Sequence, residues 1–113
     1  MIKKYRIRFS NGDAEARFDV DTDIFTKELA NDTLQFFDWE YDTDADPIDE
    51  VITKYGKHAI WLATTENVNT VGVIYAFEDS EGYCQVDGKY GITLTYVEGV
   101  DLNYDDDYSL TIL

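Results

Sequence analysis

Two alternating segments joined by Asn11-Gly12 constrain the fold of this chain more than any other feature. Within residues 2–10, Tyr5, Ile7 and Phe9 alternate with basic residues, and residues 14–20 carry an apolar side chain at every second position. A period of two is typical of a strand that buries one face, and Asn-Gly strongly favours a two-residue hairpin turn. The sequence therefore predicts an N-terminal β-hairpin with one apolar face.

The outer face of this hairpin carries a basic cluster. Residues 1–17 hold five basic and two acidic residues, although the whole chain has only nine basic residues against 24 acidic ones. Cross-strand charge pairs are expected to occupy much of this cluster. The expected partners are Arg6 and Arg8 with Glu15 and Asp19.

The hydrophobic period then changes to that of helices. Residues 24–39 repeat apolar positions at spacings of three and four, which predicts an amphipathic helix. Its expected apolar stripe consists of Phe25, Leu29, Thr33, Phe36 and Phe37. Asp46-Pro47 predicts the start of a second helix, through about residue 64, because aspartate caps helices well and proline suits the first helical position. Gly56 costs this helix about 1 kcal/mol relative to alanine, and close packing against a neighbour is one reason for a glycine there.

The chain returns to strands after one ambiguous segment. Val71–Phe77 favours a strand by its β-branched residues, but Asn69-Thr70 could equally cap a short helix. Residues 92–96 and 108–112 alternate again, as strands do. In the first of these strands the expected core side carries Ile92, Leu94 and Tyr96.

The order of these elements predicts an α+β fold. We expect an antiparallel sheet of about four strands, formed by the hairpin and the C-terminal strands, with two or three helices packed on one face. The length of 113 residues fits a single domain, residues 1–113. An aromatic content of 15% separates the chain from disordered acidic tails, despite its net charge of −15.

Several classes of protein are excluded by composition. No apolar run approaches the roughly 18–20 residues of a membrane-spanning helix, and the alternating N-terminus lacks the apolar core of a signal peptide. Because Cys84 is the single cysteine, no intrachain disulfide can form, and a reducing cytoplasm is the expected location. Direct binding to nucleic acid or to a membrane is not expected, because those surfaces are also anionic.

Catalytic and metal-binding patterns are missing from the sequence. His58 is the only histidine, so a His-His metal pair is excluded, and Cys-His catalysis would need contact between His58 and Cys84. None of the Asp-rich segments continues with the glycine and glutamate of an EF-hand loop. We therefore expect a protein that is not an enzyme and that holds no cofactor or metal.

The acidic charge is concentrated in residues 18–50, which hold twelve acidic residues and one basic residue. This segment contains two ladders of alternate carboxylates, Asp19, Asp21 and Asp23, and Asp42, Asp44 and Asp46. One interpretation is a solvated surface that includes helix-capping residues. The other is an electronegative surface that imitates a nucleic-acid backbone and binds a protein partner with a basic surface. In that case Trp39 or Tyr41 would be the apolar anchor.

Trp61 lies on the non-core face of the second predicted helix, together with Lys54, Lys57 and His58. It either packs beneath a loop or the C-terminal segment, or anchors a protein interface. In the second case the chain is a structural or accessory protein that binds a partner through Trp61, or forms a homodimer.

A family resemblance rests on three segments: FFDWEYD (36–42), DPIDEVITKYGKHAIWLAT (46–64) and EGYCQVDGKYGITLTYVEG (81–99). They resemble small acidic domains of unknown function carried by bacteriophages, prophages and mobile elements of proteobacteria. The resemblance implies a location in the bacterial cytoplasm and carries no catalytic motif. Such genomic neighbourhoods are rich in small acidic inhibitors of host defence, including anti-CRISPR and anti-restriction proteins. By that analogy the chain is a phage-type inhibitor that mimics nucleic-acid charge, and the analogy transfers no site residue.

Overall fold

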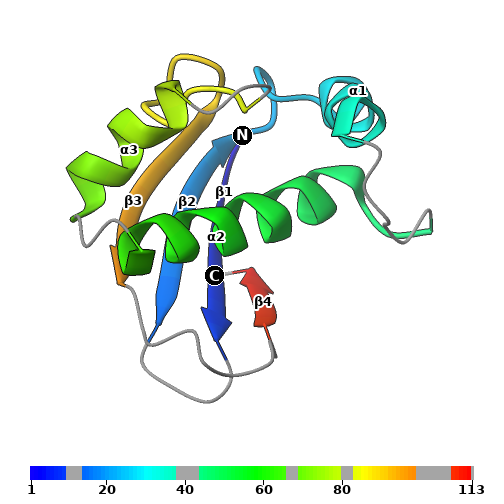
Figure 1. Cartoon of the computed structure of the whole chain (residues 1–113). Coiled ribbons are helices and arrows are strands. Elements are labelled where there is room, and N and C mark those ends of the chain that lie inside the picture. Colours follow the sequence, from blue (N-terminus) through cyan, green and yellow to red (C-terminus); the bar gives the residue numbers. More distant parts are fainter. Residues whose placement is uncertain (10–13, 38–43, 66–68, 80–82, 99–107, 113) are drawn as a thin grey trace.

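The computed structural model describes residues 1–9, 14–37, 44–65, 69–79, 83–98 and 108–112 (Figure 1). Its elements are, in chain order, β1 (Ile2–Phe9), β2 (Glu15–Asp21), α1 (Lys27–Phe37), α2 (Pro47–Thr65), α3 (Thr70–Glu78), β3 (Ile92–Glu98) and β4 (Tyr108–Ile112). The predicted α+β class and antiparallel sheet are confirmed, and the ambiguous segment Val71–Phe77 is helical, within α3. Among the helices described, none is long and apolar enough to cross a membrane.

The strands lie in the order β3-β2-β1-β4, and each neighbouring pair is antiparallel. The predicted antiparallel pairing of the two hairpin strands is confirmed, because β1 pairs with β2 from Ile2 opposite Asp21 to Arg8 opposite Glu15, whereas the predicted turn at Asn11-Gly12 lies outside the described residues. β3 and β4 add to the two outer edges of this hairpin. All three helices come between β2 and β3 in the sequence, so the sheet joins the first and last parts of the chain.

Helix α2 lies across the strands (Figure 1). It begins as predicted, since Asp46 Oδ1 accepts a hydrogen bond from the Ile48 amide at 2.9 Å. At Gly56 the helix approaches β1 so closely that a Cβ would lie 2.7 Å from Ile7 Cγ1. Close packing is therefore the reason for the glycine inside this helix.

The core below the helices is formed by alternate residues of the strands. These buried strand residues are Tyr5, Ile7, Ala16, Phe18, Val20, Ile92, Leu94 and Val97. The Tyr5 hydroxyl donates a hydrogen bond to Asp49, in the first turn of α2, at 2.7 Å. Burial raises the pKa of this hydroxyl, and the Asp49 carboxylate raises it further. Tyr5 therefore joins β1 to α2 as a neutral hydrogen-bond donor.

Helix α1 differs from the prediction in its start and in its buried face. It begins at Lys27, three residues later than predicted, while residues 38 and 39 lie outside the described residues, and its core side chains are Ala30 and Leu34. Leu29 and Phe36, which belong to the predicted stripe, are 46% and 67% exposed. Phe25 is buried but lies before the start of the helix. The direction of its side chain therefore does not show which face of the helix is buried. The predicted stripe was therefore wrong at Leu29 and Phe36, whereas Thr33 is half-buried and the side chain of Phe37 lies outside what the structure describes.

Strand β3 contains an irregularity that the alternating pattern did not predict. Arg17 is opposite Tyr96, whereas the next residue of β2, Phe18, is opposite Leu94. β3 therefore contributes one extra residue, which is a β-bulge, and the alternation reverses after it. Val97 is buried and Tyr96 is 40% exposed, so the prediction that Tyr96 lies in the core was wrong.

The outer edge of β3 is partly covered by residues 86–88. Backbone hydrogen bonds join the Leu94 amide to the Val86 carbonyl at 2.8 Å and the Gly88 amide to the Ile92 carbonyl at 3.0 Å. Farther along the strand, the Val97 amide donates to the Thr70 hydroxyl at 3.2 Å. Thr70, the first residue of α3, thus binds the edge of β3 beyond the part that residues 86–88 cover.

Candidate protein interface

The side chain of His58, on α2, stacks on two aromatic rings. Its ring is nearly parallel to Tyr83, with centroids 4.3 Å apart, and to Trp61, with centroids 6.0 Å apart. Phe77 of α3 meets the same ring edge-on at 5.0 Å. His58 is half-buried, and burial lowers the pKa of its imidazole. The neutral ring therefore serves as a packing element that links Trp61 to the core.

Tyr55 fixes this stack from the core side. Its buried ring lies 5.0 Å from Tyr83 and 5.6 Å from Phe77. The Tyr55 hydroxyl accepts a hydrogen bond from the Cys84 amide at 3.0 Å and donates one to Cys84 Sγ at 3.3 Å. Burial raises the pKa of Tyr55, so the hydroxyl keeps its proton. The segment that carries Tyr83 is thus held against α2.

Three large side chains at the end of α2 and on α3 are exposed, and we call them the Trp61 face. They are Trp61 at 48%, Val71 at 57% and Tyr75 at 63%. Val71 and Tyr75 are four residues apart and share one side of α3. The other side of α3 buries Val73 and Phe77 in the core. The Trp61 face therefore presents apolar groups on helices whose opposite sides are packed.

Sequence reasoning singled out Trp61 but missed Val71 and Tyr75. The signal was the composition of α3, whose sequence TVGVIYAFE is apolar on every side. A helix of that kind on a small domain either is surrounded by protein or exposes apolar surface. Because Val71–Phe77 was ambiguous between helix and strand, this argument was not available from the sequence.

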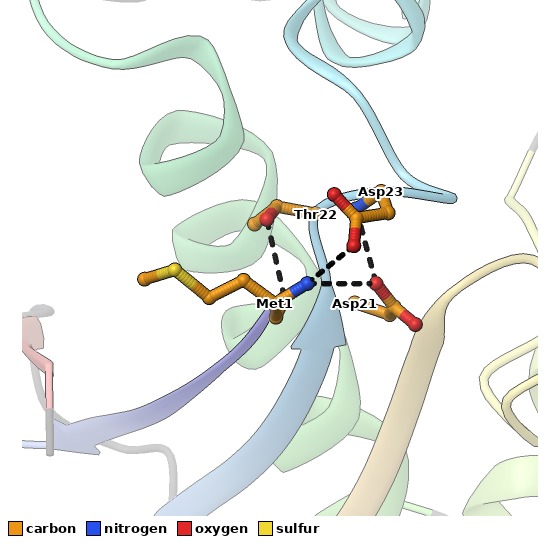
Figure 2. A network of polar contacts seen from close by, with 4 residues as sticks. All are labelled: Met1, Asp21, Thr22 and Asp23. Atoms are coloured by element: carbon orange, nitrogen blue, oxygen red, sulfur yellow. Dashed lines mark hydrogen bonds and ion pairs between the residues drawn. The ribbon is translucent and has the colours of Figure 1, made fainter.

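Each carboxylate of the first acidic ladder has a cationic partner within the chain. Asp19 forms an ion pair with Lys4 at 3.2 Å. Figure 2 shows Asp21 and Asp23 beside the Met1 amino group, at 3.4 Å and 2.6 Å. A hydrogen bond with Asp23 is the main cause that raises the pKa of this amino group. The charge of this ladder is thus partly neutralised.

The second ladder is described only in part, since Asp42, Trp39 and Tyr41 lie outside the described residues. Asp44 is exposed, whereas Asp46 caps α2 and lies 3.8 Å from the Lys27 ammonium group. Within the part of the chain that the structure describes, no group of three or more His, Cys, Asp and Glu residues could hold a metal ion.

Comparison with known proteins identifies relatives of this chain. A family described as "Protein of unknown function (DUF2528)" matches residues 16–109. The chain is 26% identical over 117 aligned residues to "Protein ea10" of Escherichia phage lambda and to "Lambda prophage-derived protein ea10" of Escherichia coli O6:H1, covering 96% of this chain and 95% of each relative. The predicted resemblance to phage and prophage domains of unknown function is confirmed. No solved structure matches the chain.

Proposed function

The chain belongs to the DUF2528 family of proteins of unknown function, and from this premise we propose that it is a non-enzymatic protein that binds a protein partner through the Trp61 face. The observation that carries this proposal is the exposure of Trp61, Val71 and Tyr75 on two helices whose opposite sides are already packed. Water is a poor solvent for such surface, and contact with a partner removes it from water.

The support behind Trp61 strengthens the proposal. Stacking on His58 restricts the orientation of Trp61 before any partner arrives, which lowers the entropy cost of binding. Tryptophan and tyrosine are enriched among the residues that dominate binding energy, and truncation of such a residue costs about 2 kcal/mol or more. Trp61 and Tyr75 are therefore the expected anchors, with Val71 as additional apolar contact.

The relatives suggest where this binding takes place. They belong to a phage and a prophage, which supports a structural or accessory role in the cytoplasm of a bacterial host. The partner could also be a second copy of the chain, in which case two Trp61 faces would pair in a homodimer. For the fold, we likewise propose a sheet of four strands with its helices packed on one face. The pairing of β4 with β1 supports the fourth strand.

A second candidate function is the mimicry of nucleic-acid charge. It is favoured by the net charge of −15 and by the carboxylates that lead into α2. Asp19, Asp21 and Asp23 have cationic partners, and Asp46 lies near Lys27. Mimicry by the second ladder, Asp42, Asp44 and Asp46, would therefore depend mainly on Asp42 and Asp44, with Trp39 or Tyr41 as anchor. The partner would be a host protein with a basic nucleic-acid-binding surface, as for an anti-CRISPR or anti-restriction inhibitor.

Affinity capture from a bacterial lysate tests the first proposal. Immobilised wild type is compared with Trp61→Ala, Tyr75→Ala and the control Tyr90→Ala, which removes an exposed tyrosine elsewhere. We expect a protein that both wild type and Tyr90→Ala retain and that the first two variants lose, with elution insensitive to salt. Light scattering at two protein concentrations detects the homodimer. Equal retention by all four proteins would contradict the role of the Trp61 face.

The same capture distinguishes mimicry. A variant with Asp42, Asp44 and Asp46 replaced by Asn keeps the cap of α2, because asparagine caps helices as well as aspartate. Mimicry predicts a partner that elutes at moderate salt from wild type and is missing from this variant. A partner that binds both proteins equally excludes mimicry by these residues.

A further inference from the structure

Helix α1 carries an apolar side that its contact with α2 does not bury. Its core side chains are Ala30 and Leu34, and α2 is the one described element that the helix contacts. Leu29 and Phe36 are exposed, and with Thr33 they follow one another at spacings of four and three, so they share one side of the helix. This side therefore offers apolar surface that the core does not use.

The apolar side of α1 forms one wall of a groove, which we call the α1 groove. Its volume is about 380 Å³, which lies within the roughly 300–1,000 Å³ of small-molecule sites. The facing wall comes from the residues just before α1 and from the segment 84–90. The lining includes Phe25, Leu29, Asp32, Phe36, Cys84 and Tyr90. A mostly apolar lining with few polar groups is typical of a site that binds a small molecule.

The backbone fixes the two walls of the α1 groove relative to each other. The Asp21 amide donates a hydrogen bond to the Gly91 carbonyl at 2.7 Å. Gly91 has a φ of 90°, and a Cβ at this position would lie 2.8 Å from the Phe25 amide nitrogen. Glycine allows both this conformation and this close approach. The segment that carries Cys84 and Tyr90 is therefore held beside Phe25, and a preformed groove lowers the cost of binding.

Asp32 is the only charged residue among the described residues that line the groove. It is exposed, and none of the ion pairs between described residues includes it. Two other polar groups of the lining are already bonded, since the Thr33 hydroxyl donates to the Leu29 carbonyl and Cys84 Sγ accepts from Tyr55. The groove therefore combines apolar surface with one carboxylate that a ligand can reach.

The charges around the groove are also negative in sum. Residues 21–36 and 84–91, which contain the lining, hold five acidic and two basic residues, a net charge of −3. The Met1 amino group, beside Asp21 and Asp23, reduces this to −2. Lys89 is one of the two basic residues, with Nζ 5.6 Å from the centroid of the Tyr90 ring. The surroundings thus favour a cation even after these positive charges have been counted.

We propose that the α1 groove binds a small molecule that has an apolar body and one cationic amine. The apolar body lies on Leu29, Phe36 and Tyr90 and removes their surface from water. The ammonium group pairs with Asp32, and the aromatic rings of the lining attract a cation further. This site shares no lining residue with the Trp61 face, so either proposal can fail without the other.

Nuclear magnetic resonance titration of the full chain tests this proposal with three matched probes. They are 4-phenylbutylammonium, 4-phenylbutanol and 4-phenylbutyrate, which share an apolar body and differ in charge. Each is added at about pH 7 and about 0.15 M salt, where the amine and the acid are both charged. We expect saturable shifts of the amides of residues 24–36 and 84–91 with the ammonium probe. The alcohol should bind about fourfold more weakly, the effect of one exposed ion pair, and the butyrate most weakly.

Two variants and a control separate the charge from the apolar wall. Asp32→Asn should weaken binding of the ammonium probe about fourfold and leave binding of the alcohol unchanged, because it removes only the charge. Leu29→Ala should weaken all three probes, because it removes part of the wall that they share. The control Glu98→Gln removes an exposed carboxylate opposite Glu15, at the end of β2 far from the groove, and should bind like wild type.

Three outcomes would overturn the proposal. The first is the absence of saturable shifts of these amides with the ammonium probe, or full binding by Leu29→Ala. The second is binding of the alcohol or the butyrate as tight as that of the ammonium probe, or equal effects of Asp32→Asn and Glu98→Gln, since the groove would then select no cation. The third is concentration-dependent shifts of these amides in the protein alone, which would assign the groove to a second copy. Spectra of the free variants show whether each has kept its fold.

Discussion

On β1, Tyr5 and Ile7 are wholly buried against α2, whereas Arg6 and Arg8, each one residue away, lie on the opposite, charged side of the sheet. The buried side is closely fitted, with a hydrogen bond from Tyr5 and contact between Ile7 and Gly56. The charged side includes a like-charge pair and a buried donor that lacks a described partner. The difference indicates that the buried side stabilises the fold more than the charged side does. Substitutions on the two faces should then act in opposite directions.

The largest effect is expected on the buried side, from Gly56→Ala. The added Cβ would meet the branched base of Ile7, which cannot move without shifting β1. Overpacking costs about 1–3 kcal/mol, and alanine returns about 1 kcal/mol of helix propensity. Because three atoms of Ile7 lie within 3.0 Å of the added Cβ, the overpacking cost falls at the upper end of this range, and we expect a net loss of about 2 kcal/mol in the free energy of unfolding, measured by urea denaturation. Lys57→Ala, at the next and exposed position, is the control, and an equal loss there would refute close packing as the cause.

A second effect should appear at alkaline pH, through Tyr55. Its pKa is raised by burial, so above the ordinary value of 10 the unfolded chain releases this proton while the folded chain keeps it. Stability is therefore complete below pH 10 and falls as the pH rises above it, by at most about 1.4 kcal/mol per pH unit for one tyrosine. Between pH 9 and 11 the free energy of unfolding, measured by denaturation, should fall less steeply with pH for Tyr55→Phe than for wild type. The control Tyr75→Phe changes an exposed tyrosine and should show the same pH dependence as wild type. If Tyr55→Phe also showed the pH dependence of wild type, the prediction would be contradicted.

The smallest effect has the opposite sign and tests the charged side. Arg6→Thr removes the like-charge pair with Arg17 and the buried donor, and threonine suits a strand. We expect the free energy of unfolding to increase by about 1 kcal/mol. Arg8→Thr, opposite Glu15, is the matched variant and should lower it slightly, because it removes an opposite-charge pair. If Arg6→Thr were the more destabilising of the two, the contrast between the faces would fail.

Much of the fold follows from local sequence signals. The pairing of β1 with β2 follows from the alternation of both segments, and the start of α2 follows from Asp46 and its capping hydrogen bond. Both signals act over a few residues, so no distant part of the chain can override them easily. Gly56 is a further case, because a glycine inside a helix implied a close neighbour, although the sequence could not identify Ile7.

The features that sequence reasoning missed depend on contacts between distant segments. The β-bulge near Tyr96 is visible only in the pairing of β3 with β2, since the sequence of β3 alternates on either side of it. The buried face of α1 depends on its contact with α2, whereas the predicted stripe was extended from Phe25, which precedes the helix.

The candidate sites could be predicted only in part. Trp61 was found because a tryptophan stood on the polar side of a well-defined helix. The cationic partners of Asp21 and Asp23 could not be found, because the Met1 amino group reaches them only through the register of β1 with β2. The basic cluster of the hairpin was visible in the sequence, but the expected pairing of Arg6 with an acidic residue was wrong, since Arg6 lies opposite Arg17.

The hydrogen bonds from residues 86–88 and from Thr70 along the edge of β3 have a consequence for aggregation. An exposed edge strand offers a template on which the strand of another molecule can add, which is the first step toward ordered aggregates. At Ile92, Leu94 and Val97 the backbone groups that would act as this template are already bonded within the chain. A partner that approached these residues of β3 would therefore have to be recognised by side chains, which can discriminate between partners, and not by backbone pairing, which any extended chain could provide.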